Sequence, residues 1–313
     1  MRSRFAFLLL APIAFTGCSR SNGPPPFEMP PVRVVCTTTI VADIVTRVGG
    51  DRVAVESLMG PGVDPHKYQP TAGDKAKLEA AHLVFFNGLH LEGKMVDTFE
   101  KATGKYRATA VTRAMNHAEL RHAEIDGGGE HDPHVWFDVK LWAKAVGPVR
   151  EALAELDPAG TDTYKANADK YLAELDALDK DVREQLARVP AAMRVLVTSH
   201  DAFGYFGRAY GFEVLGLQGV STATELGIKN RQDLADALGR RKIPAVFTET
   251  SVPDDGLKSV LETVLKDHKH AVRLIGGDDA LYSDALGAPG GSGGTYADMV
   301  RHNVKVIVEA LTK

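Results

Sequence analysis

Residues 158–187 read PAGTDTYKANADKYLAELDALDKDVREQLA and form the longest helical pattern in the chain. Charged side chains separate the apolar ones, which recur mostly three or four residues apart: Tyr164, Ala168, Tyr171, Leu172, Leu175, Leu178, Val182 and Leu186. Because no glycine or proline interrupts residues 166–189, this spacing predicts one amphipathic helix rather than two shorter ones. At about 1.5 Å per residue the helix would be about 45 Å long, enough to run along two lobes.

Strand-like runs alternate with helical patterns on both sides of this helix. Before it, β-prone runs occur at residues 32–36, 53–58, 83–87 and 108–111, with helical patterns at residues 40–48 and 73–81. After it, the runs return at residues 195–199, 214–217, 245–249 and 272–275. Such alternation is typical of a parallel sheet with helices on its faces. We therefore predict an α/β fold with two lobes, residues 32–157 and 189–313, each a parallel sheet flanked by helices, joined by one long helix at residues 158–188.

The first residues have the pattern of an export signal. Two arginines precede an apolar run at residues 5–15, which is too short to span a bilayer because a helix needs about 20 apolar residues. Small residues stand ahead of Cys18, as in the lipobox of bacterial lipoproteins, which this stretch resembles although Phe15 replaces the usual leucine. We expect a signal peptide at residues 1–17 and a lipid on Cys18; an ordinary secretory signal with an incidental cysteine is the alternative.

The rest of the composition limits the classes of partner. Residues 18–31 are rich in Ser, Gly and Pro, which predicts a disordered tether after the lipidated Cys18. No further long apolar segment follows, so the lipid anchor would be the only contact with the membrane. A net charge of −4, with 44% hydrophobic and 25% charged residues, describes an ordinary globular protein, and no basic run points to nucleic acid. With Cys18 lipidated, Cys36 has no partner for a disulfide within the chain.

Asp-Pro-His occurs twice, as Asp64-Pro65-His66 and as Asp132-Pro133-His134. Each copy follows a short apolar run, and its proline restricts the backbone so that a stiff turn holds the imidazole. His200 stands directly after the run at residues 195–199, and Asp284 lies beyond the run at residues 272–275. Since ligands collect at the carboxyl ends of parallel strands, these three histidines and Asp284 can face one cleft, two from each lobe. Such a set suits Zn²⁺, and also Mn²⁺ if the carboxylate binds through both oxygens.

Four segments occur in the order of the signature segments of a known family. They are DPHKYQP at residues 64–70, DPHVWFD at 132–138, SHDAFGYF at 199–206 and YSDA at 282–285. They resemble those of the zinc and manganese solute-binding proteins of ABC importers, and the TroA-like members most closely, over residues 32–313. The resemblance implies that His66, His134, His200 and Asp284 bind the metal. It also implies one long helix between the lobes and a monomer that hands Zn²⁺ or Mn²⁺ to an ABC permease.

Three further features bear on the site. Manganese-dedicated members of the family often have Glu in place of the third ligand, where this chain has His200. Zinc-dedicated members often carry a His-rich acidic loop before the second Asp-Pro-His. In this chain the corresponding residues 116–132 contain only three histidines. Their mixed charge and three consecutive glycines favour a solvated loop over a loop that collects metal. Glu249 ends a strand-like run, where it can orient a metal ligand or form a strand-end salt bridge.

Three functions compete. The favoured one is an extracytoplasmic solute-binding protein, lipid-anchored to the cell membrane, that captures a divalent transition metal, with Zn²⁺ ahead of Mn²⁺. An exported zinc-dependent hydrolase is the alternative, but a catalytic zinc keeps three protein ligands and an open position, whereas four ligands close the shell. The chain also lacks a His-Glu-x-x-His helix. The third alternative is a surface adhesion protein, but no residue specifically supports it. We therefore do not expect an enzyme.

Overall fold

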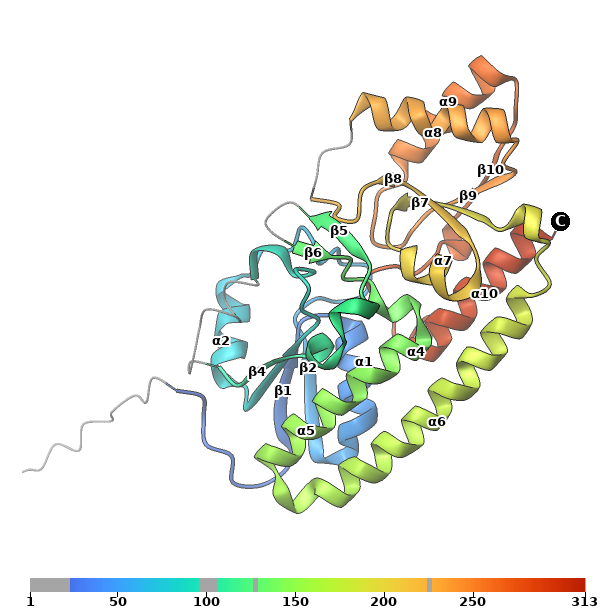
Figure 1. The fold of residues 1–313 in the computed structure, drawn as a ribbon. Coiled ribbons are helices and arrows are strands. Elements are labelled where there is room, and N and C mark those ends of the chain that lie inside the picture. The colour runs from blue at the N-terminus through green and yellow to red at the C-terminus, as the bar shows by residue number, and fades with distance from the viewer. Residues whose placement is uncertain (1–22, 96–98, 100–105, 126–128, 224–226, 313) are drawn as a thin grey trace, which may run out of the picture.

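The computed structural model describes residues 23–95, 99, 106–125, 129–223 and 227–312. Within them the chain forms two lobes, each built on a four-stranded parallel sheet, and one long helix runs along both (Figure 1). The predicted α/β fold is therefore confirmed. Cys18 and the expected signal peptide at residues 1–17 lie outside the described residues. No described helix is both long and apolar enough to cross a bilayer.

The N-terminal lobe has one sheet between two layers of helices. Its strands, in spatial order, are β2 (Val53–Ser57), β1 (Val32–Cys36), β3 (Leu83–Phe86) and β4 (Ala108–Ala110). The helices within its described residues are α1 (Thr39–Gly49), α2 (Ala72–Ala80), α4 (Val139–Trp142) and α5 (Val146–Leu156). Strand β1 is buried on both faces, because Val34 packs into the cluster that contains α1 while Val35 packs with Leu78 of α2. Burial on both faces accounts for the apolar run that predicted this strand.

The C-terminal lobe repeats this layering. Its strands, in spatial order, are β10 (Arg273–Ile275), β9 (Ala245–Phe247), β7 (Val195–His200) and β8 (Glu213–Gln218). Its helices are α7 (Gly204–Tyr210), α8 (Ile228–Arg241), α9 (Asp255–His268) and α10 (Tyr296–Leu311). Short 3-10 turns lie at Gly50–Arg52, Gly93–Met95, Val111–Ala114, His117–Glu119, Val135–Phe137, Ala143–Ala145, Pro158–Gly160, Ala191–Met193 and Gly277–Asp279. Strand β7 extends one residue further than expected, so that His200 is its last residue.

The long helix is α6 (Thr161–Leu186), preceded by the 3-10 turn Pro158–Gly160. Its buried stripe consists of Tyr164, Ala168, Tyr171, Leu175, Leu178, Val182 and Leu186, which keeps the predicted spacing of three and four. Leu172 was expected in this stripe and is instead 37% exposed. The reason is geometric, since consecutive residues point about 100° apart around a helix and Tyr171 already faces the core.

Each end of α6 is tied to a different lobe. Near its start Tyr164 donates a hydrogen bond of 2.6 Å to Asp157, whose carboxylate also accepts from Arg52 of the N-terminal lobe at 2.8 and 2.9 Å. Near its end Asp179 accepts a hydrogen bond of 3.1 Å from Tyr210 of α7. The helix therefore spans both lobes without a break, as its sequence pattern predicts.

Buried side chains also connect the lobes directly. One hydrophobic cluster runs from the N-terminal lobe through α6 into the C-terminal lobe. Trp136 of the N-terminal lobe donates from its indole to the carbonyl of Ser283 at 2.9 Å, and Tyr296 of α10 donates to the carbonyl of Trp136 at 2.7 Å. The rings of Phe137 and Phe203 pack with their centroids 4.2 Å apart. Packing and hydrogen bonds thus fix the lobes relative to each other in addition to α6.

Residues 116–132 differ from the loop expected there. They contain a two-stranded antiparallel hairpin, β5 (His122–Ile125) and β6 (Gly129–His131), with residues 126–128 outside the described part of the chain. Strands of three or four residues are too short to leave a clear alternation in the sequence. The hairpin returns the chain toward Asp132, whose backbone N–H donates to the carbonyl of Arg121 at 2.9 Å.

The described part of the expected tether, residues 23–31, forms neither helix nor strand. It nevertheless contacts the N-terminal lobe. The ring of Phe27 meets that of His82 edge to face at 5.4 Å, and Arg107 donates to the carbonyl of Pro25 at 2.9 Å. Part of the segment whose composition predicts disorder is therefore in contact with the lobe, through the ring of Phe27 and the carbonyl of Pro25.

Shortening one side chain in the buried stripe of α6 should destabilise the whole protein. Leu175 is 2% exposed, so Leu175→Ala should lower the free energy of unfolding by about 2–5 kcal/mol. Leu172→Ala, three residues earlier on the exposed face, is the matched control and should change it by no more than about 0.5 kcal/mol. Urea unfolding followed by circular dichroism measures both. Equal losses in the two variants would contradict the assignment of the buried face.

Candidate metal centre

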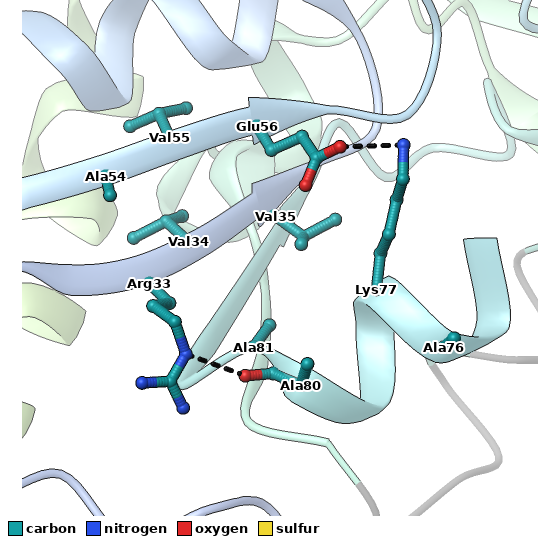
Figure 2. Close-up of a pocket in the computed structure, with 10 residues that line it drawn as sticks. All are labelled: Arg33, Val34, Val35, Ala54, Val55, Glu56, Ala76, Lys77, Ala80 and Ala81. Carbon is teal, nitrogen blue, oxygen red and sulfur yellow. Dashed lines mark hydrogen bonds and ion pairs between the residues drawn. The ribbon is translucent and has the colours of Figure 1, made fainter. Parts of the chain in front are cut away.

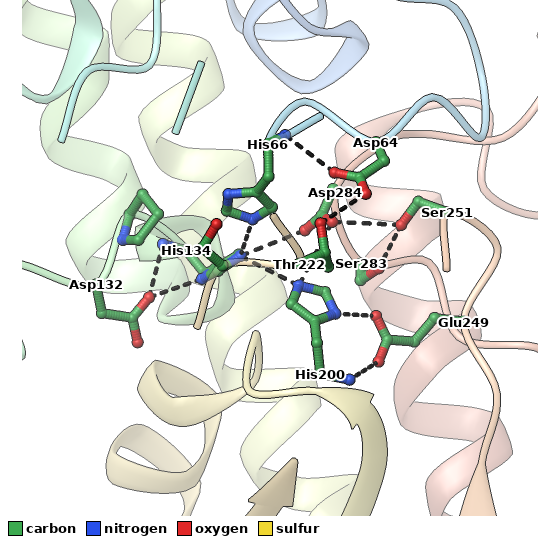
Figure 3. A network of polar contacts seen from close by, with 12 residues as sticks. Asp64, His66, Asp132, His134, His200, Thr222, Glu249, Ser251, Ser283 and Asp284 are labelled. Atoms are coloured by element: carbon green, nitrogen blue, oxygen red, sulfur yellow. Dashed lines mark hydrogen bonds and ion pairs between the residues drawn. The ribbon is translucent and has the colours of Figure 1, made fainter. Parts of the chain in front are cut away.

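Four side chains from separate elements converge where the two lobes meet (Figure 3). His66 lies in the loop after β2, His134 directly precedes a 3-10 turn, His200 ends β7, and Asp284 lies between β10 and α10. The exposed fraction is 6% for His66 and 0% for the other three. One ligand atom from each lies within 4.8 Å of every other. The structure thus brings together the four residues that the sequence singled out as metal ligands.

The spacing of these atoms fits one metal ion. Nε2 of His134 lies 3.2 Å from Nε2 of His66 and 3.4 Å from Nε2 of His200. Asp284 places Oδ1 3.4 Å from Nε2 of His134 and Oδ2 3.4 Å from Nε2 of His200. In a tetrahedral zinc site with bonds of about 2.0–2.1 Å, neighbouring ligand atoms are about 3.3 Å apart. These four separations are close to the edge of such a site, and both oxygens of the carboxylate face the cluster.

The two Asp-Pro-His segments fold in the same way locally. In each, Oδ1 of the aspartate accepts a hydrogen bond from the backbone N–H of the histidine two residues later, at 2.9 Å for His66 and 3.0 Å for His134. A side chain that bonds its own backbone two residues on stabilises a tight turn, and the proline between them restricts φ. The repeat is therefore a turn that presents an imidazole, and both its aspartate and its proline contribute to that turn.

Carboxylates behind two of the histidines orient their rings. Oδ1 of Asp132 lies 2.8 Å from Nδ1 of His134, and its other oxygen is paired with Arg121. Oε2 of Glu249 lies 2.6 Å from Nδ1 of His200, while Oε1 accepts the backbone N–H of His200 at 2.9 Å. A carboxylate at Nδ1 favours the tautomer with the proton there and leaves Nε2 for a metal. The structure places Glu249 beside His200, in the position expected for a residue that orients it.

Asp284 has spare capacity to bind a cation. Within the described part of the chain its Oδ2 accepts one long hydrogen bond, of 3.4 Å from the hydroxyl of Ser251, and that hydroxyl lies 2.8 Å from the hydroxyl of Ser283. Its Oδ1 is buried and has no hydrogen-bond partner among the described residues, although Nε2 of His134 lies 3.4 Å away. A buried carboxylate oxygen without a hydrogen bond is costly unless a cation compensates it. The chemistry of this atom therefore fits a metal ligand.

The four groups differ in their affinity for protons. Burial lowers the pKa of His66 to about 3. Burial acts in the same direction on His134, but Asp132 and Asp284 outweigh it and raise the pKa of His134 to about 9. The pKa of His200 rises well above its usual value, because Glu249 and Asp284 outweigh burial. The pKa of Asp284 falls well below its usual value, since the two neighbouring imidazoles outweigh burial. An arriving metal would replace the added protons on His134 and His200.

A buried carboxylate supports the site from the N-terminal lobe. Glu92 is fully buried and accepts hydrogen bonds from the hydroxyl of Thr37 at 2.8 Å and from the backbone N–H of Asn87 at 2.6 Å. Burial raises the pKa of this carboxyl. Asn87 in turn donates to the carbonyl of Pro133 at 3.1 Å, directly before His134. The loop after β3 thus holds the second Asp-Pro-His turn from behind.

The histidines of residues 116–132 do not form a second cluster of this kind. Nδ1 of His117 lies 3.0 Å from Nε2 of His131, and both belong to the segment around the hairpin. No third His, Cys, Asp or Glu of the described residues joins them within bonding range of one ion. The pair therefore lacks the ligand number found at the junction of the lobes.

A hollow of about 480 Å³ lies elsewhere, beneath α2 on the face of the first sheet (Figure 2). Its lining residues are Arg33, Val34, Val35, Ala54, Val55, Glu56, Ala76, Lys77, Ala80 and Ala81. The carboxylate of Glu56 is paired with Lys77 at 2.7 Å, and Arg33 donates to the carbonyl of Ala80 at 3.1 Å. Without histidine or cysteine, and with its carboxylate already paired, this hollow does not suit a transition metal.

Asp132 and Arg121 contribute to the site in ways that were not predicted from the sequence, where Asp132 was named only as part of the second Asp-Pro-His motif. For Asp132 a local pattern was present, since an aspartate two residues before a backbone N–H often closes a turn. For Arg121 no local pattern exists. It lies 11 residues before Asp132 and reaches it only because the hairpin reverses the chain between them.

Known proteins share this fold and much of this sequence. The chain is 42% identical over 306 residues to the manganese-binding lipoprotein MntA of Bacillus subtilis (strain 168), covering 98% of both chains. It is 46% identical over 280 residues to the zinc-binding protein TroA of Treponema pallidum (strain Nichols), covering 90% of this chain and 89% of that one. The solved structure of the periplasmic zinc binding protein TroA of Treponema pallidum matches with a TM-score of 0.85 at 44% identity, covering 91% of this chain and 100% of that chain.

The family comparison covers nearly the whole described chain. The sequence profile of ZnuA, described as zinc-uptake complex component A, periplasmic, matches residues 34–310. This match confirms the resemblance inferred from the four signature segments, which span most of the same range. The chain therefore belongs to the ZnuA family of metal-binding periplasmic proteins.

Proposed function

We propose that this protein captures one divalent transition metal outside the cytoplasm and delivers it to an ABC permease. One observation carries the proposal: three imidazoles and one carboxylate, two from each lobe, are buried together with ligand atoms within 4.8 Å. The relatives named as metal-binding proteins support it. Because one chain supplies all four ligands, we propose that it acts as a monomer.

Capture explains the site better than hydrolysis does. A catalytic zinc needs a position open to water or substrate, whereas His66, His134, His200 and Asp284 would fill a tetrahedral shell. These side chains are between 0% and 6% exposed, so a substrate larger than the ion would have no access to it. A closed shell suits a carrier, which holds its cargo without reacting with it.

We propose Zn²⁺ as the cargo, with Mn²⁺ as the second candidate. Three imidazoles and one carboxylate suit a tetrahedral zinc site, and distances of 3.2 and 3.4 Å between the imidazole nitrogens are compatible with its edge. The two oxygens of Asp284 both face the cluster, which would also let the carboxylate bind a manganese ion through both. The relatives include one named for each metal.

Removing an imidazole should weaken metal binding. For His66→Ala and for His200→Ala we expect a loss of zinc affinity of at least about ten-fold. Removing a residue that only orients a metal ligand already lowers metal affinity by about that factor. His268→Ala is the control, because His268 pairs with Asp236 at 3.1 Å far from the cluster in the fold. Competition titration against a chromogenic zinc chelator measures all three. Unchanged affinity in both site variants would refute the ligand assignment.

The transport role can be tested in the cell. A strain that lacks this protein should take up less radiolabelled Zn²⁺, wild-type protein should restore uptake, and Asp284→Ala should not. Metal analysis of the protein isolated from its native envelope identifies the cargo directly. Affinity measurements alone do not identify it, because sites made of nitrogen and oxygen ligands bind Zn²⁺ more tightly than Mn²⁺ whichever metal is transported. Normal uptake of both metals in the deletion strain would rule out the transport role.

We further propose that a lipid on Cys18 holds the protein on the outer side of a membrane. The apolar run and small residues ahead of Cys18 support this, as do relatives named as lipoproteins. In Cys18→Ser the protein should move from the membrane fraction to the soluble fraction while its zinc affinity stays unchanged, since Cys18 precedes the described lobes. Immunoblots of fractionated cells measure this. A variant that is cleaved normally and still sediments with membranes would show that the anchor lies elsewhere.

A further inference from the structure

The two Asp-Pro-His turns differ in the partner of their second carboxylate oxygen. In the second turn, Asp132 bonds the ring of its own histidine and pairs with Arg121. In the first turn, Oδ2 of Asp64 instead accepts a hydrogen bond of 2.6 Å from the hydroxyl of Thr222 (Figure 3). Thr222 belongs to the other lobe, in the segment after β8, so this bond crosses the junction between the lobes.

His66 is also held differently from the other histidines. Glu249 and Asp132 stand behind the rings of His200 and His134, but no described residue outside the cluster makes a hydrogen bond to the ring of His66. His66 lies on a loop, whereas His200 ends a strand. Its position therefore depends mainly on its turn, and the turn depends on Asp64.

We propose that the hydrogen bond from Thr222 to Asp64 is a latch that holds the His66 turn from the opposite lobe and sets the rate of metal release. The inference rests on the proposed function and adds a positioning residue to it. Thr222 is 1% exposed, so water competes little for its hydroxyl. Among the described residues, Lys67 pairs with Oδ2 of Asp64 at 3.8 Å, but its side chain is half exposed, which makes it a weak substitute for the hydroxyl of Thr222.

The latch makes release a local event. The lobes are joined by α6 and by buried contacts such as that of Trp136 with Ser283, so His200, His134 and Asp284 are held in place. When the bond from Thr222 breaks, the first turn can move while the rest of the site stays intact. Opening one loop leaves an ion on three ligands, from which exchange to water or to a receptor is faster.

The test compares isosteric and conservative variants of one residue. Thr222→Val keeps the shape and removes the hydroxyl, and Thr222→Ser keeps the hydroxyl. Protein loaded with Zn²⁺ is mixed with excess chelator in a stopped-flow instrument. We expect release about ten-fold faster in Thr222→Val, close to the wild-type rate in Thr222→Ser, and unchanged association rates. With Co²⁺ as the probe, the absorption bands of Thr222→Val should match wild type, because all four ligands are kept.

Two controls separate the latch from general loosening. Ser221→Ala removes the neighbouring hydroxyl, which accepts from Ala223 within the same segment at 3.2 Å and does not reach the other lobe; it should leave release unchanged. In a His66→Ala background, Thr222→Val should have no further effect, because the ligand through which it acts is gone.

An unchanged release rate in Thr222→Val, an equal acceleration in Ser221→Ala, or a persistent effect without His66 would each overturn the latch. If wild type binds neither Zn²⁺ nor Mn²⁺, the proposed function fails with it, whereas normal binding with unaltered release refutes the latch alone.

Discussion

The rigid connection between the two lobes is the constraint on which the metal centre depends. Each lobe supplies two of the four candidate ligands, so the cluster exists only while the lobes keep one relative position. Helix α6 provides this, because its first turn is bonded to Asp157 and its last turns to Tyr210 of the other lobe. A helix without internal proline or glycine resists bending, since bending breaks its backbone hydrogen bonds. The shared core around Trp136 adds a second connection close to the site.

Burial gives the centre its chemical character. Three imidazoles and a carboxylate removed from water would be unfavourable without compensation. Two kinds of compensation are present: carboxylates behind His134 and His200, and the contacts of those two rings with Asp284. The attraction between this carboxylate and the two rings lowers the pKa of Asp284 and raises the pKa of His134 and His200. A divalent cation placed among these atoms would satisfy the carboxylate more fully than protons do, which is why the site is suited to binding.

The fold could be predicted largely from local patterns. Strands buried on both faces leave short apolar runs, and a helix packed along one side leaves a stripe at spacings of three and four, so both periods are visible in the chain. The same reasoning placed Leu172 in the buried stripe of α6, but this residue lies beside the stripe and is exposed, because Tyr171 next to it already faces the core. It also missed β5 and β6, whose three or four residues are too few for a pattern, and the contacts of Phe27 and Pro25 on the N-terminal lobe.

By itself the sequence determined which residues could serve as ligands, because a turn of Asp-Pro-His and the end of a strand are local structures that neighbouring residues create. Only the tertiary structure decided what stands behind each ligand. Both turns have the same three residues and the same internal hydrogen bond, yet Asp132 meets Arg121 and Asp64 meets Thr222. Those partners lie 11 and 158 residues away in the chain. The physical reason is that a hydrogen bond between distant segments requires the packing of the lobes to bring them together, and no local pattern records that packing.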